Sequence, residues 1–262
     1  MPELLGILTR HLEPFLLAFF RLGAMLAWAP VIGHRSIPVM HRAGIAAALA
    51  LVLAPTLGAA ARPGGLDAVG WVIAVAGEVF VGLAVGFVAM LVVAAADAAG
   101  ELIGFEMGLS IGVVFNPSTG GQEGLVTRVL NTIALLLFLA VNGHHLLIRA
   151  VAVSFERLRP GAAFDPAMAG GLVSLGGKLL ESGVALAAPV VGVLVVLNVA
   201  LGLIGRVVPQ SNVFLVGLPV SIGLGLLGLY EAMPGITQSL ERLIGNTAAN
   251  LDGLFAAVMH GR

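Results

Sequence analysis

The chain has 262 residues, of which 59% are hydrophobic and only 10% are charged, and its mean hydropathy is +1.06. An average soluble domain carries about 25% charged residues, so 13 basic and 14 acidic side chains cannot cover a soluble fold of this length. A net charge of −1 without a basic cluster excludes a nucleic-acid-binding protein. The absence of cysteine excludes disulfides and thiolate sites. The composition therefore predicts an all-α integral membrane protein.

Stretches of about 20 apolar residues divide the chain into about six predicted membrane segments. About eight residues around Arg206 join the last two segments, which predicts a tight helical hairpin. After Glu231, apolar residues at helical spacing predict an amphipathic end helix: Ile236, Leu240, Leu243 and Ile244. The six segments, in chain order, are 12–32, 43–61, 68–96, 125–148, 183–205 and 207–230.

Prolines 30, 55, 189 and 219 lie within or at the edges of these apolar segments. Each removes a helical hydrogen bond, and inside a membrane the freed backbone groups need partners from neighbouring polypeptide. Together with 36 glycines, they predict bent helical hairpins that lean on one another within a larger helical assembly.

The connection 97–124 is rich in glycine and is net acidic. Its glycines at 100, 104, 108 and 112 are four residues apart, so on a helix they would form one bare stripe that permits close packing. Residues 101–117 alternate glycine with bulky apolar side chains, which suit an apolar niche lined by protein. A constriction in a pore is one such niche, because apolar rings gate by excluding water.

Arg21, Glu78 and Asn198 are polar residues that lie inside apolar segments. A charge in a membrane helix costs roughly 2.5–3.5 kcal/mol on insertion scales, so it normally faces a partner or water. We favour an ion pair or a contact with a neighbouring subunit over an ion pathway. With the polar residues of the hairpin connection, six positions are expected to be buried or at a subunit interface: Arg21, Glu78, Asn198, Arg206, Gln210 and Asn212.

Two glycine motifs allow other functions. Residues 108–112 match the G-x-S-x-G nucleophile pattern, and Ser110 with His144 would suit an intramembrane protease, but that motif needs a preceding strand. Residues 223–228 match G-x-G-x-x-G, but they lie in the middle of an apolar segment, which favours helix packing over dinucleotide binding. No metal-ligand spacing occurs around His144 and His145. We therefore predict a protein without catalytic residues, metal or cofactor.

The sequence resembles the FliR family of flagellar biosynthesis proteins, subunits of the type III secretion export gate. The resemblance runs from about Arg21 to about Leu243 and is strongest over 198–219, which contains Arg206-Val-Val-Pro-Gln210-Ser-Asn212. Further matching stretches are 100–110, 135–144 and the residues Ala29-Pro30 with Arg35-Ser-Ile-Pro38.

The resemblance implies a non-enzymatic subunit in the bacterial inner membrane, at the flagellar basal body. FliP, FliQ and FlhB homologues are the implied partners, and unfolded exported proteins are the implied cargo. Residues 1–160 are implied to be similar to FliP, and 161–262, with the hairpin and end helix, to FliQ. The segment 104–122, here called the plug segment, is implied to close the pore. Its implied plug residues are Phe105, Met107, Leu109, Ile111, Val113, Val114 and Phe115.

Two residues depart from the family pattern: Glu106 stands where an uncharged glutamine is expected, and Asn116 where aspartate is usual. The related injectisome subunits tend to carry a lysine shortly after the proline at 219, whereas Val220 and Ser221 follow here. We therefore favour the flagellar branch over a virulence injectisome. An autonomous small-solute transporter is a further alternative that broken helices would suit.

Overall fold

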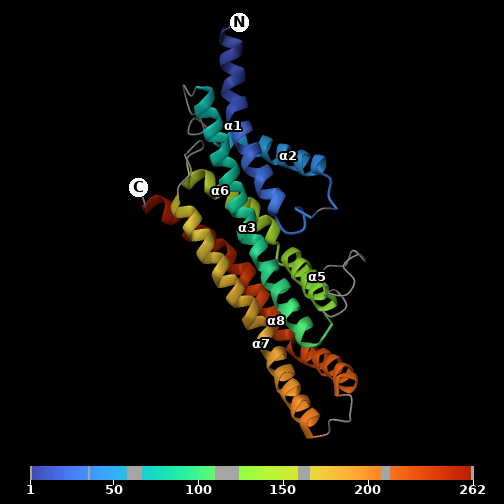
Figure 1. Cartoon of the computed structure of the whole chain (residues 1–262). Helices are drawn as coiled ribbons and strands as arrows, with labels where there is room; N and C mark the ends of the chain where they lie inside the picture. The colour runs from blue at the N-terminus through green and yellow to red at the C-terminus, as the bar shows by residue number, and fades with distance from the viewer. Residues whose placement is uncertain are drawn as a thin grey trace. The chain divides into compact units, whose positions relative to one another are not determined.

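The computed structural model describes residues 2–34, 36–57, 67–109, 124–158, 166–207 and 213–260. Within these ranges the chain consists of helices and short turns, without a strand (Figure 1). This confirms the all-α prediction. The helices, in chain order, are α1 (Pro2–Trp28), α2 (Val39–Leu57), α3 (Ala68–Glu106), α5 (Leu125–Ala140), α6 (Gly143–Arg157), α7 (Pro166–Val207) and α8 (Val213–His260).

The described residues contain fewer candidate membrane spans than the six apolar segments predicted from the sequence. In the described part of the chain, three helices are long and apolar enough to cross a membrane, and the α5–α6 pair makes a fourth if it counts as one broken span. The apolar part of α2, Val39–Pro55, is shorter than the roughly 20 residues that a span requires. The all-α membrane class is confirmed, and the candidate spans among the described residues are slightly fewer than the six apolar segments predicted.

Several predicted boundaries also differ. The predicted segment 125–148 is broken after Ala140, because Asn142 adopts a left-handed conformation with φ of 59°. The helices α3, α7 and α8 extend well beyond their predicted apolar segments. The predicted amphipathic end helix is continuous with α8, and its apolar residues Ile236, Leu240 and Ile244 are buried as their spacing predicts.

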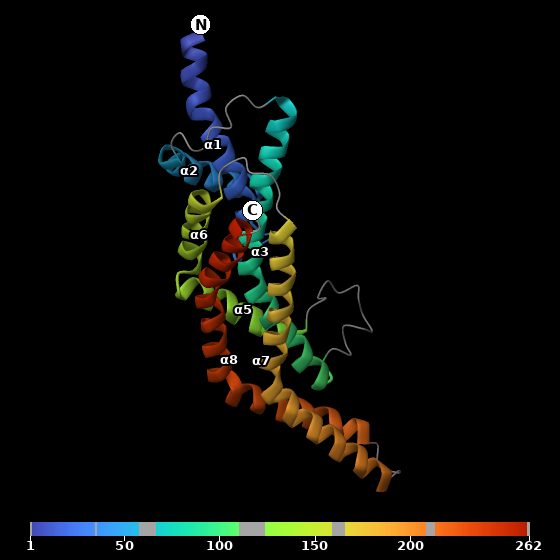
Figure 2. The same cartoon turned by 90° about the vertical axis from the view of Figure 1, so that its left-hand side faces the viewer.

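Prolines 55, 189 and 219 lie inside α2, α7 and α8, and Pro234 lies inside α8 as well. Figure 2 shows that α7 and α8 are both bent along their length. A proline inside a helix removes one backbone hydrogen bond and pushes on the preceding turn, so bends in these helices have a local cause.

The chain forms two compact units. The first comprises Met1–Met90, Asn142–Gly176 and Gly245–Arg262, and the second comprises Leu91–Val141 and Gly177–Ile244. In the first unit, α1 buries one face through Ala18, Leu22 and Met25, at the three- and four-residue spacing of a helical stripe. In the second unit, the end of α7 and the start of α8 run side by side in both views (Figures 1 and 2).

Small residues bring the helices of the second unit close together. A Cβ atom at Gly183 of α7 would lie 2.9 Å from the carbonyl oxygen of Ala95 in α3. A Cβ atom at Gly100 of α3 would collide with the backbone of Thr127 in α5. One turn away, the Asn131 amide donates to the Asp97 carboxylate at 2.6 Å. Close approach through small residues is how helices pack without a hydrophobic driving force from water.

Candidate functional site

A buried ion pair lies at the centre of the first unit. Arg21 of α1 and Glu78 of α3 are each 1% exposed, and Arg21 Nε donates to Glu78 Oε2 at 2.6 Å. The structure thus brings together two residues that are 57 positions apart and that sequence analysis identified separately. A buried charge needs both an opposite charge and further hydrogen bonds to offset its lost hydration.

Helix α6 supplies two further contacts to the Arg21 guanidinium. Its Nη1 donates to the Ser154 hydroxyl at 2.8 Å, and that hydroxyl donates in turn to the Val151 carbonyl at 2.6 Å. The Arg21 guanidinium carbon also lies 3.9 Å from the centre of the Phe155 ring, a cation–π distance. Arg21 therefore ties α1, α3 and α6 together.

Two glycines let α1 approach α3 closely enough for this pair. Gly82 and Gly86 follow Glu78 at four-residue spacing, so all three lie on one face of α3. A Cβ atom at Gly82 would collide with the Arg21 carbonyl, and one at Gly86 would lie 2.6 Å from the Met25 carbonyl oxygen. The stripe of Gly82 and Gly86 was not predicted from the sequence, although the four-residue spacing of these glycines from Glu78 could have indicated it. Ser154 was missed as well; its signal was a hydroxyl between the apolar residues Val151 and Leu158.

The start of the plug segment lies in the second unit, where α3 ends. The Gly108 amide donates to the Phe105 carbonyl at 2.9 Å, and the Leu109 amide donates to the Gly104 carbonyl at 3.0 Å. With Gly108 at a φ of 76°, these two bonds form a Schellman motif, which ends a helix at a left-handed glycine. The glycine stripe predicted over 100–112 therefore does not continue as helix through Gly108.

Met107 anchors this helix end. Its side chain is fully buried, and a Cβ atom at Gly225 of α8 would lie only 2.5 Å from Met107 Cγ and 2.9 Å from its sulfur. The glycine thus leaves the space that the methionine fills. Phe105, two residues earlier, is 71% exposed. The same helix end therefore presents one apolar side chain to the core of the unit and one outward.

Glu106, one of the two residues that depart from the family pattern, contacts α7. Its Oε2 accepts a hydrogen bond of 3.0 Å from the Asn198 amide of α7. A pocket of about 380 Å³ lies beside these residues, between the end of α3, the stretch 198–205 of α7 and the stretch 217–221 of α8. Glycines 202, 205 and 217 contribute to its lining.

Of the remaining predicted site residues, three lie in the described part of the chain and six do not. Asn198 and Arg206 are exposed in the single chain, and their place at a subunit interface stays a prediction. Leu109 is half-buried. Six positions lie outside the described residues: Ile111, Val113, Val114, Phe115, Gln210 and Asn212.

The two glycine motifs lie in helical surroundings. The residues before Gly108 form α3 rather than the strand that a nucleophile elbow requires, and Ser110 lies outside the described residues. Glycines 223, 225 and 228 lie inside α8, where Gly225 leaves room for Met107, whereas a Cβ atom at Gly228 would make only an ordinary contact, 3.6 Å from a Val190 methyl group. Packing therefore accounts for Gly225 of this motif.

The fold and its apolar helices define a helical membrane protein, and comparison with known families narrows that class. The family of bacterial export proteins, family 1, matches residues 12–247. The chain therefore belongs to this family.

Among curated relatives, the chain is 34% identical to the flagellar biosynthetic protein FliR of Bacillus subtilis, over 93% of this chain and 95% of the relative. It is 36% identical to FliR of Caulobacter vibrioides, over 85% and 89%, and 32% identical to FliR of Escherichia coli, over 85% of each. These names describe flagellar biosynthesis, and none of them names an enzyme.

Proposed function

We propose that the chain is a subunit of the flagellar type III protein export gate. With FliP- and FliQ-like partners, it forms and seals the channel for unfolded export substrates, and FlhB associates with that gate. The observation that carries this proposal is the family match over residues 12–247 together with relatives named for flagellar biosynthesis. Those names also favour the flagellar branch over a virulence injectisome.

The proposed gate lies in the bacterial inner membrane, at the flagellar basal body. Residues 1–160 take the FliP-like part, and residues 161–262 take the FliQ-like part. The long apolar helices support a membrane location. Large apolar side chains exposed along the α7–α8 hairpin, among them Leu203, Val207 and Val216, support contacts with further apolar surfaces, since exposed apolar patches mark interfaces with proteins or membranes.

The plug segment seals the channel in this proposal. Its beginning is held in two ways, by Met107 against Gly225 and by the hydrogen bond between Asn198 and Glu106. The Schellman motif at Gly108 ends α3 inside the plug segment. A seal needs a fixed base, and these contacts support that role for residues 105–109.

Deletion of the gene in its own host tests the function. We expect deletion cells to lose swimming motility and to stop releasing hook and filament proteins into the medium, because the export channel cannot assemble. Re-expression of the intact chain should restore both, and the tagged chain should co-purify with FliP- and FliQ-like proteins. Motile deletion cells would contradict the proposal. Loss of effector secretion with normal motility would assign the chain to an injectisome.

A further inference from the structure

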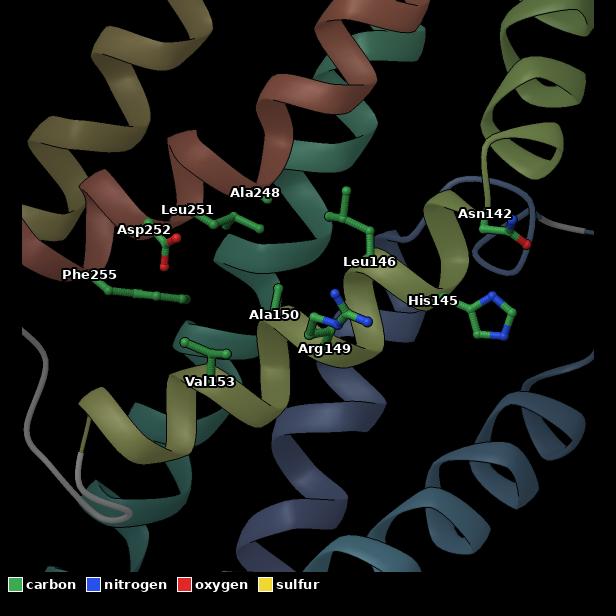
Figure 3. Close-up of a pocket in the computed structure, with 10 residues that line it drawn as sticks. All are labelled: Asn142, His145, Leu146, Arg149, Ala150, Val153, Ala248, Leu251, Asp252 and Phe255. Carbon is green, nitrogen blue, oxygen red and sulfur yellow. The ribbon is translucent and has the colours of Figure 1, made fainter.

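A second pocket lies within the first unit, between α6 and the last turns of α8. Its volume is about 330 Å³. Figure 3 shows residues of the two helices facing each other across it. The apolar lining comes from both helices: Leu146, Ala150, Val153, Leu251 and Phe255. Polar side chains complete the lining: Asn142, His145, Arg149 and Asp252.

The charges of this pocket are unevenly compensated. Asp252 Oδ1 lies 3.2 Å from Arg157 Nη2, so the acidic group already has a cation. Arg149 is exposed and forms no hydrogen bond or ion pair with any residue that the structure describes. His145 makes a ring contact with His144, with the ring centres 4.2 Å apart. The lining therefore holds one arginine whose charge is not neutralised by the described residues.

The uncompensated arginine and the apolar lining share one face of α6. His145, Arg149 and Val153 are four residues apart, so they follow one another along the helix. A small soluble anion would pair with the arginine but would not contact the apolar lining of the pocket. A purely apolar ligand would contact that lining but would leave the arginine unpaired. A ligand with an anionic head and an apolar chain uses both.

We propose that this pocket binds an anionic phospholipid. The lipid phosphate accepts hydrogen bonds from the Arg149 guanidinium, because arginine pairs with phosphate in a bidentate geometry. His145 and Asn142 also line the pocket and offer further donors. One acyl chain lies along Leu146, Val153 and Phe255. Basic pockets between the helices of membrane proteins bind acidic lipid headgroups by this combination of charge and apolar contact.

Native mass spectrometry of the full chain in detergent micelles tests the site, with phosphatidylglycerol or phosphatidylcholine added. We expect Arg149→Gln to lower retention of phosphatidylglycerol about tenfold, since a hydrogen-bonded charge contributes about that factor. Retention of phosphatidylcholine should change little. The matched control is Arg128→Gln, which removes an exposed arginine of α5 and should leave retention of both lipids unchanged.

Two further measurements distinguish a bound lipid from other occupants of the pocket. Ala150→Phe places a larger side chain in the apolar part of the pocket and should lower retention of phosphatidylglycerol. Excess inorganic phosphate should not displace phosphatidylglycerol from the intact chain. Unchanged phosphatidylglycerol retention in Arg149→Gln would overturn the proposal. Displacement by inorganic phosphate, with no effect of Ala150→Phe, would indicate a simple anion site instead. Release of the lipid when partner subunits bind would assign the pocket to a protein contact, which also contradicts the proposal.

Discussion

Replacing Glu78 with alanine is expected to lower the free energy of unfolding by about 3–5 kcal/mol, the usual cost of leaving one member of a buried ion pair alone. Arg21 would keep its hydrogen bond to Ser154 and its contact with Phe155. It would lose the carboxylate that lies 2.6 Å from its Nε. Denaturant titration of the purified chain in detergent micelles measures the change.

Two variants show whether the cost comes from the unpaired charge. Glu241→Ala removes an exposed acidic residue of α8 and should change the free energy of unfolding by less than about 0.5 kcal/mol. The double variant Arg21→Met with Glu78→Leu removes both charges, and replacing a whole buried pair by apolar residues is often close to neutral. A double variant as unstable as Glu78→Ala would show that shape, not charge, is decisive here.

The second large effect is expected from Met107→Ala. Truncating a buried methionine costs about 2–5 kcal/mol, because the cavity left behind collapses only partly. Here the cavity would open against Gly225, which has no side chain to fill it. Because Met107 holds the beginning of the plug segment, an added protease should also cleave the variant faster within 104–122 than the intact chain.

Phe105→Ala is the matched control for Met107→Ala. It removes a larger apolar side chain only two residues away, but that side chain is 71% exposed. Its effect on the free energy of unfolding should stay within about 0.5 kcal/mol. Equal losses in the two variants would contradict the anchoring role of Met107, since burial would then not distinguish them.

Composition and apolar periodicity predict the all-α membrane class and most of the helices. Class and helices depend on local sequence and on whether each helix face meets water or an apolar environment. Composition and periodicity fail at the ends of elements. A left-handed Asn142 breaks the predicted fourth segment, and asparagine is one of the few residues that adopts this conformation readily. The spacing of Gly108 fits a glycine stripe along a helix, whereas its backbone conformation fits a helix end. The hydrogen bonds from the Gly108 and Leu109 amides show that it is the helix end.

The candidate site was predictable to a similar extent. Arg21 and Glu78 stand out because charge is costly in an apolar segment. Their pairing, however, depends on the close approach of α1 and α3 at Gly82 and Gly86. Hydropathy does not reveal that approach, because glycine has no side chain. Met107 was identified among the plug residues through resemblance, but its burial against Gly225 is a contact between distant parts of the chain. Spacing within one helix cannot predict such a contact.

The most direct test of the proposed gate is the permeability of the assembled complex to small solutes after deletion of residues 106–116. The deletion removes Met107 and Phe115, so we expect a gate that still co-purifies with its FliP- and FliQ-like partners but leaks ions and small dyes when reconstituted in vesicles. Met107→Ala with Phe115→Ala should leak in the same way, and the intact chain should stay closed. A deletion variant that assembles fully and remains as tight as the intact gate would contradict the assignment of this segment as the seal.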